Sequence, residues 1–240
     1  MLFENVNKIL MIQKITIEGY KSIKEQTVEL FPINILIGGN GIGKSNFISA
    51  FTLIHNLYER NLQNYVLTKG GSDSLLYMGK KETDHLSFDL FFAERGKDAH
   101  NRFIVNMKEA QDSLFIERID TAYHNGVSWH KQLHEVNKQE SSFKNDHTGQ
   151  AFYVNSFLRE FEVYHFHDTG DRSPMKGKCN MDDNVSLKNN GANIAAFLYY
   201  LKEKHPKHFT RIEKAVRRGN ETKDWWGPIN AGVTLVWKLF

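Results

Sequence analysis

Apolar residues recur at every second position in the middle of the chain, which predicts β-strands. In LSFDLFFAE (86–94) and RFIVNMK (102–108) the apolar side chains occupy every second position, and LFIERI (114–119) and GVSWHKQL (126–133) follow at short intervals. A period of two is typical of a strand with one buried face. These segments predict an antiparallel meander that follows a first helix.

Two other regions have the three- and four-residue spacing of an amphipathic helix. Residues 47–58 form the first, and a pair of helices is predicted on either side of Pro206, a residue that suits a first helical turn. Gly219-Asn220 is expected to end the second helix of the pair. A polar loop is predicted at 137–150 and a short helix at 151–162. The apolar positions are Phe47, Ala50, Phe51, Ile54, Leu57 and Tyr58, then Ile194, Phe197, Leu198 and Leu201, then Phe209, Ile212 and Val216.

The stretch INILIGGNGIGKSNFISAF (33–51) combines a strand, a glycine loop and the first of these helices. Its β-branched run (Ile33, Ile35, Leu36, Ile37) predicts a short strand buried on both faces. Four glycines within six residues are too costly in backbone entropy for a regular strand or helix. Within the loop, G-x-x-x-x-G-K-[ST] is satisfied, which is the P-loop pattern. The matching positions are Gly38, Gly43, Lys44 and Ser45.

The chemistry of phosphate binding explains these residue types. Glycines let successive backbone N–H groups converge on phosphate oxygens, and the helix directs its positive end at the same anion. Lys44 is then expected to contact the β- and γ-phosphates and Ser45 to donate a hydroxyl ligand to Mg²⁺. A chance match is the alternative, and the strand and helix on either side make it the weaker one. The predicted nucleotide-binding residues are Gly38, Gly39, Asn40, Gly41, Ile42, Gly43, Lys44, Ser45 and Asn46, with Ser45 as the Mg²⁺ ligand.

Composition narrows the class of protein without naming a partner. The 240 residues, 40% hydrophobic and 25% charged, are those of one large or two small globular domains. The net charge of +3 is too small to indicate which class of partner the protein binds. Cys179 is the only cysteine, so no intrachain disulfide can form, which favours a reducing, cytoplasmic compartment. Polar residues interrupt the N-terminal segment, and no later stretch has 18 apolar residues, so we expect neither export nor a membrane span.

The segment ITIEGYKSIKEQTVELFPINILIGGNGIGKSNFISAF (15–51) resembles the opening of the RecF/SMC-like branch of ABC-type ATPases. The likeness includes the turn Gly19–Ser22, and the asparagines Asn40 and Asn46. Gly39 and Ile42 replace the usual Pro and Ser, which removes no phosphate-contacting group. The resemblance implies an α/β P-loop NTPase head with an antiparallel β portion and C-terminal helices. It also implies ATP and Mg²⁺ as cofactors, ATPase activity, and a role in DNA maintenance or phage defence.

The resemblance extends more weakly over 12–218, which suggests three segments. We expect 1–11 to be a leader or upstream-start extension, 12–218 to be an incomplete ATPase head, and 219–240 to be a divergent tail. Trp225, Trp226 and Trp237 mark the change in composition. A truncated or frame-shifted end is one interpretation of this tail; a genuine short strand in AGVTLVWKLF is the other.

Two features of the family are not found, so its activity does not carry over unchanged. Relatives have a late signature loop and an apolar strand ending in Asp-Glu, which serve Mg²⁺ and the attacking water. Here Asp89 lies mid-strand, Ala precedes Glu94, and no acid follows Asp168, so no catalytic residue is assigned. One hypothesis is an ATPase in which two heads of a homodimer sandwich the nucleotide. The other is a non-hydrolysing nucleotide-binding module or remnant that works with a DNA or nuclease partner. A small P-loop kinase or GTPase is a third, weaker interpretation, since its Asp-containing strand and N-K-x-D motif are not found.

Three further sets of polar or basic residues are candidate functional sites, and ordinary solvent-exposed residues are the alternative for each. A histidine- and aspartate-rich segment is a candidate metal site or γ-phosphate loop, though neighbouring zinc-ligand spacing is lacking. Basic residues at helical spacing form a candidate stripe for nucleic-acid phosphates, and a solvated helix face is the alternative. Lys21 is a candidate nucleotide contact. The first group is His165, His167, Asp168 and Asp171; the stripe is Lys204, Lys207, His208, Arg211, Lys214 and Arg218.

Overall fold

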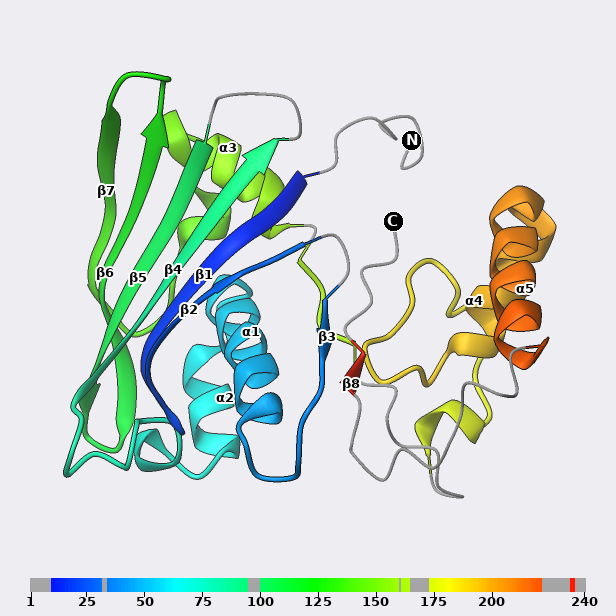
Figure 1. Ribbon diagram of the computed structural model, residues 1–240, viewed down its shortest axis with the longest axis horizontal. Coiled ribbons are helices and arrows are strands. Elements are labelled where there is room, and N and C mark those ends of the chain that lie inside the picture. The colour runs from blue at the N-terminus through cyan, green and yellow to red at the C-terminus, as the bar shows by residue number, and fades with distance from the viewer. Residues whose placement is uncertain are drawn as a thin grey trace. The chain divides into compact units, whose positions relative to one another are not determined.

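The protein divides into two compact units, which are described separately. The computed structural model describes residues 10–31, 34–94, 100–159, 161–164, 173–221 and 234–235. The first unit comprises residues 1–34 and 41–161, and the second comprises 35–40 and 162–240. Figure 1 labels the elements of both.

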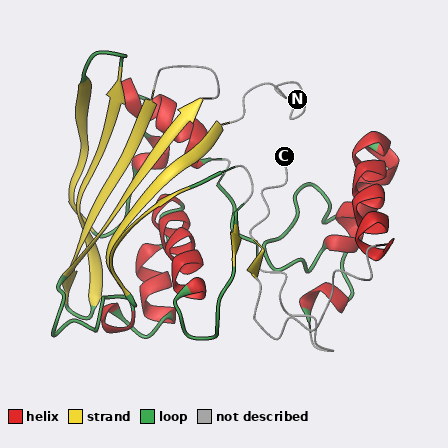
Figure 2. Ribbon diagram, in the orientation of Figure 1, coloured by secondary structure: helices red, strands yellow, loops and turns green. Residues whose placement is uncertain are grey.

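A six-stranded antiparallel sheet forms the frame of the first unit (Figure 2). Its spatial order is β2-β1-β4-β5-β6-β7, so the last four strands are consecutive hairpins. This confirms the antiparallel meander that the period-two pattern predicts. The strands are β1 (Leu10–Tyr20), β2 (Ile23–Glu29), β4 (His85–Glu94), β5 (His100–Ala110), β6 (Ser113–His124) and β7 (Trp129–Lys138).

Three helices share a hydrophobic core with one face of this sheet (Figure 1). They are α1 (Lys44–Tyr58), α2 (Leu62–Thr68) and α3 (Gly149–Leu158), and α1 confirms the helix predicted at 47–58. Ring contacts tie α3 to the sheet, because the Phe92 and Phe157 centroids are 4.7 Å apart. The apolar positions that alternate along β4 and β5 all lie in this core. They are Leu86, Phe88, Leu90, Phe92, Phe103, Val105 and Met107.

The predicted polar loop at 137–150 is only partly a loop. β7 continues to Lys138, and a 3₁₀ turn, η2 (Phe143–Asn145), buries the Phe143 ring completely. That ring lies 5.1 Å from the ring of Phe103, centroid to centroid. A single aromatic residue among polar ones carries no periodicity, which is why the pattern misses this anchor. A second 3₁₀ turn of this unit is η1 (Ser72–Ser74).

A distant carboxylate fixes the start of α2. Glu140 Oε2 accepts a hydrogen bond from the Leu62 N–H at 3.0 Å, and Oε1 accepts one from the Gln63 N–H at 2.8 Å. The N-cap residue Asn61 makes no side-chain capping bond. Helix N-termini leave N–H groups without intrahelical partners, so Glu140 takes the place of a capping side chain.

The second unit contains a short strand pair and two helices. β3 (Ile35–Leu36) pairs antiparallel with β8 (Thr234–Leu235), and α4 (Ile194–Lys204) is followed by α5 (Pro206–Glu221). The helix pair confirms the prediction around Pro206, although α5 runs past Gly219-Asn220. The short strand expected in the tail is present at β8. A 3₁₀ turn, η3 (Pro174–Lys176), also belongs to this unit.

The prediction of a strand buried on both faces at 33–37 is wrong. The strand is two residues long, and the side chains of Ile35 and Ile37 are 55% and 71% exposed. Among the described residues β3 pairs with β8 alone, so no further layer covers these isoleucines.

Several predictions lie outside the described residues. These are the candidate metal or γ-phosphate segment, most of the proposed leader, and the tryptophans of the tail. Among the described helices, none is long and apolar enough to cross a membrane. The residues concerned are 1–9, His165, His167, Asp168, Asp171, Trp225, Trp226 and Trp237.

Candidate nucleotide-binding site

The backbone at the end of the glycine loop explains why glycine is required there. Gly43 is the N-cap of α1 and has φ 97°, and Gly41 has φ 85°. Residues with a Cβ rarely adopt this left-handed conformation. At Gly43 a Cβ would also lie 3.2 Å from the Ser22 hydroxyl oxygen. The loop therefore turns into α1 along a path that glycine allows and other residues would strain.

The first turn of α1 has the properties of an anion site. Its N-cap, Gly43, has no side chain to cap the N–H groups, and the first turn contains no acidic residue. The first helical bond runs from the Phe47 N–H to the Gly43 carbonyl at 2.9 Å. N–H groups and the helix dipole favour a negative group here, and a phosphate fits that chemistry.

The predicted binding residues divide between the two units. Residues 41–46 lie in the first unit, where Ser45 is exposed and Lys44 and Asn46 are partly buried. Ile42 is 64% exposed and leads directly into Gly43. Residues 38–40 lie in the second unit. A Cβ at Gly39 would meet no atom within 4 Å, so local space does not require glycine at that position.

The turn Gly19–Ser22, between β1 and β2, contacts the start of α1. Asn46 Nδ2 donates to Ser22 Oγ at 2.8 Å, and Lys21 Nζ donates to Ser49 Oγ at 3.1 Å. Lys21 stays a candidate nucleotide contact, and its ammonium donates one hydrogen bond to a hydroxyl of the second turn of α1. Burial lowers the pKa of Lys21, and the charge of Lys69 lowers it further. Ser22 and Ser49 are the functional candidates that residue patterns miss, because their partners are distant in sequence.

Asp89, an acidic residue of β4, is held in an ion pair. The Asp89 carboxylate binds the Arg102 guanidinium across β4 and β5, with Nε donating at 3.1 Å. In the part of the chain that is described, no group of three or more His, Cys, Asp or Glu side chains could hold a metal ion. Mg²⁺ takes oxygen ligands, and Ser45, in the first turn of α1, carries a hydroxyl oxygen.

Part of the predicted basic stripe lies on α5. Lys207, Arg211 and Lys214 are exposed and, with Pro206 and Thr210, line an open hollow of about 400 Å³. Lys204 belongs to the end of α4, so it does not continue the stripe at helical spacing.

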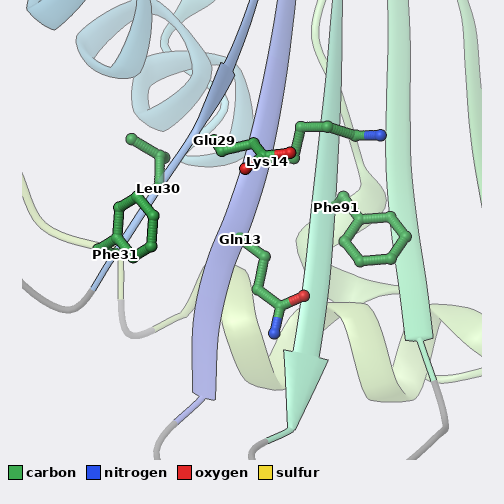
Figure 3. A pocket seen from close by; sticks show the side chains of 6 residues that line it. All are labelled: Gln13, Lys14, Glu29, Leu30, Phe31 and Phe91. Carbon is green, nitrogen blue, oxygen red and sulfur yellow. The ribbon is translucent and has the colours of Figure 1, made fainter.

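Another hollow, of about 390 Å³, lies beside β1, β2 and β4 (Figure 3). Its residues on β1 come from the N-terminal half of that strand, whereas the turn that contacts α1 follows the C-terminal end. This hollow is therefore separate from the P-loop contacts. Its lining residues are Gln13, Lys14, Glu29, Leu30, Phe31 and Phe91.

The comparison with protein families gives an independent result. The model described as "AAA ATPase domain" matches residues 11–224, which is most of the chain. Comparison with curated proteins gave no match. The family match agrees with the P-loop pattern and the mixed α/β fold, and it is consistent with the resemblance to RecF/SMC-like P-loop ATPases. The chain therefore belongs to the AAA ATPase domain family, and at the level of that family it is an ATP-binding ATPase.

Proposed function

We propose that the protein is a Mg²⁺-dependent ATPase of the RecF/SMC-like class that binds Mg-ATP on loop 38–46. The conformation of Gly43 is the observation that carries this proposal. Its left-handed backbone places the start of α1 directly after the glycine loop, with Lys44 and Ser45 as the first helical residues. This order of backbone and side-chain groups is the one that phosphate binding requires.

Each polar group of the loop has a role in the proposed reaction. Backbone N–H groups hold the phosphate oxygens, Lys44 neutralises charge on the β- and γ-phosphates, and Ser45 Oγ is a ligand of the Mg²⁺ ion. An Mg²⁺ ion held there would supply positive charge that offsets the negative charge of the phosphates. Phosphoryl transfer needs mainly positioning and charge neutralisation, which these groups supply.

The site of one chain is proposed to be completed by a second copy. Similar ATPases sandwich the nucleotide between two heads, so groups that orient the attacking water can come from the partner. We extend the proposal to DNA maintenance or phage defence, with α5 as the DNA-contacting surface. The support is chemical: the side chains of Lys207, Arg211 and Lys214 line one hollow with no acidic residue among its lining.

A nucleotide-binding module without turnover is the second candidate, and the ion pair of Asp89 favours it. This residue lies within FDLFFAE (88–94), and its carboxylate is held by Arg102. A carboxylate whose charge is already paired with a guanidinium is a poor ligand for Mg²⁺. Under this alternative the chain would bind Mg-ATP and release no phosphate.

Equilibrium binding of ATP, with and without Mg²⁺, tests the proposal. We compare the native chain with Lys44→Ala and with Lys24→Ala, a matched control that removes an exposed lysine of β2. Native binding that depends on Mg²⁺, loss of binding in Lys44→Ala and native-like binding in Lys24→Ala are expected. Equal binding by native and Lys44→Ala would refute the proposal.

Phosphate release in the same samples separates the two candidates. Phosphate release by the native chain supports the ATPase. A rate of release per chain that rises with protein concentration supports the two-headed site. Binding without release supports the non-hydrolysing module. Adding duplex DNA tests α5: a variant with Lys207, Arg211 and Lys214 changed to alanine should bind DNA more weakly and with a smaller salt dependence than the native chain.

A further inference from the structure

We infer that the turn Gly19–Ser22 positions the P-loop for nucleotide binding, with Ser22 as the positioning residue. This inference rests on the proposed binding of Mg-ATP. It assigns a role to residues outside the P-loop, through their contacts with α1. The argument follows three sets of contacts, all within the first unit.

The first contacts join Ser22 to the loop itself. Its hydroxyl oxygen accepts a hydrogen bond from Asn46 Nδ2 at 2.8 Å, in the first turn of α1. The same oxygen lies 3.2 Å from the position of a Cβ at residue 43. Ser22 therefore binds the third residue of the helix and occupies the space beside the N-cap glycine. A shift of this hydroxyl would move the helix start, where the N–H groups for phosphate lie.

The second contacts converge on Ser49, one turn further along α1. Ser49 Oγ donates to the Asn46 carbonyl at 2.9 Å, which uses its only proton. It then accepts from Tyr20 OH at 2.9 Å and from Lys21 Nζ at 3.1 Å. Tyr20 is fully buried, and burial raises the pKa of its hydroxyl, so it keeps the proton that it donates. Tyr20, Lys21 and Ser22 thus hold two successive turns of α1.

The third set of contacts joins the turn to the segment 75–77 and to β4. The Lys21 N–H donates to the Leu75 carbonyl, and the Tyr77 N–H donates to the Gly19 carbonyl, both at 2.9 Å. Gly19 has φ 69°, and a Cβ there would lie 2.3 Å from the His85 carbonyl oxygen. The turn is therefore fixed against the segment 75–77 and against β4. A fixed turn can transmit its position to α1, whereas a mobile one could not.

Because binding depends on where the α1 N–H groups lie, loss of the Ser22 hydroxyl should weaken nucleotide binding more than it weakens the fold. The Ser22–Asn46 bond is exposed, and exposed hydrogen bonds contribute little to stability. A hydrogen bond that orients a binding group is expected to change affinity about fivefold.

The experiment measures the Kd of Mg-ATP and the melting temperature for four proteins. These are the native chain, Ser22→Ala, Ser22→Thr and Thr16→Ala. Thr16 donates to or accepts from the Thr27 hydroxyl at 2.9 Å in an exposed bond between β1 and β2, so Thr16→Ala is a matched loss far from α1. We expect Ser22→Ala to raise Kd about fivefold, Ser22→Thr to restore it because the hydroxyl returns, and Thr16→Ala to stay within about twofold of native.

When the native chain binds Mg-ATP, two results would overturn the inference. In the first, Ser22→Ala binds Mg-ATP within twofold of the native chain. In the second, Thr16→Ala weakens binding as much as Ser22→Ala, which would make the effect a general loss of stability. The native chain and Lys44→Ala identify the failing step. If the native chain binds no Mg-ATP, the proposed function fails and the inference fails with it. The inference alone fails if the native chain and Ser22→Ala bind Mg-ATP equally well while Lys44→Ala does not bind it.

Discussion

Replacing Glu140 with glutamine tests whether a carboxylate from a distant segment stabilises the start of α2. In the native chain each carboxylate oxygen accepts one backbone N–H, from Leu62 and from Gln63. Glutamine keeps one oxygen acceptor and loses both the second acceptor and the negative charge. One of the two hydrogen bonds is therefore lost, together with the favourable interaction of the charge with the helix dipole.

The size of the effect follows from these two losses. A hydrogen bond to a charged group contributes about 1.5 kcal/mol or more, and a charge at a helix N-terminus contributes about 0.3–1 kcal/mol. Glu140 is only partly buried, so solvent screens part of this and we expect a loss of about 1–2 kcal/mol. For a domain of this size that corresponds to a melting temperature lower by about 2–8 °C.

Thermal unfolding followed by circular dichroism at the helix band measures this shift. Glu117→Gln is the matched control, because Glu117 is exposed on β6 and the chemical change is the same. Hydrogen exchange locates the effect, since the amides of Leu62 and Gln63 should exchange faster in Glu140→Gln than in the native chain. A melting temperature within about 1 °C of native, or an equal drop in Glu117→Gln, would refute the reasoning.

Two other substitutions give sharp expectations. Gly19→Ala should lower the melting temperature strongly, because a Cβ would lie 2.3 Å from the His85 carbonyl oxygen at a left-handed φ that alone costs about 1–2 kcal/mol; an unchanged melting temperature would show that the turn adapts freely. Asp146→Asn should destabilise the chain at neutral pH: burial raises the pKa of Asp146, but hydrogen bonds from Thr148 and His134 outweigh it and hold that pKa below its ordinary value. Because the pKa of Asp146 is lower in the folded state than in the unfolded state, its ionised carboxylate stabilises the fold above the unfolded-state pKa. This stabilisation is lost as the pH falls through the folded-state pKa. The difference in unfolding free energy between the native chain and Asp146→Asn, measured by urea titration, should therefore shrink below about pH 4. A difference that stays constant from pH 7 to pH 3 would contradict this.

Periodicity predicted the parts of the fold whose residues repeat. The alternation in 86–94 and 102–108 matched β4 and β5, and the spacing in 47–58 matched α1. The strand at 33–37 was predicted too long and too buried. Its apolar composition was read correctly, but burial depends on which strands lie beside it, and composition does not record that.

The P-loop pattern identified its residues because the chemistry needs a fixed spacing. The residues that hold the starts of α1 and α2 follow no such rule: Ser22 lies 24 residues before Asn46, and Glu140 lies 78 residues after Leu62. Such pairs are set by the path of the chain through space. The resemblance at Gly19–Ser22 pointed to the right turn, but the contacts of Ser22 and Ser49 required the structure.

The strand order has a consequence for how the chain folds. β4 to β7 are joined in sequence by short connections, so each can pair with its predecessor as a local hairpin. β1 pairs with β4 only after the long segment 21–84, which contains α1 and the glycine loop, has been closed. Closing a long segment costs entropy that no local contact repays, and non-local pairing slows folding. We therefore expect the meander to form first and the P-loop to be assembled late, when β1 joins the sheet. A ligand that binds the finished loop would then oppose the earliest step of unfolding, so nucleotide would slow the loss of structure at β1 before it affects β5 to β7.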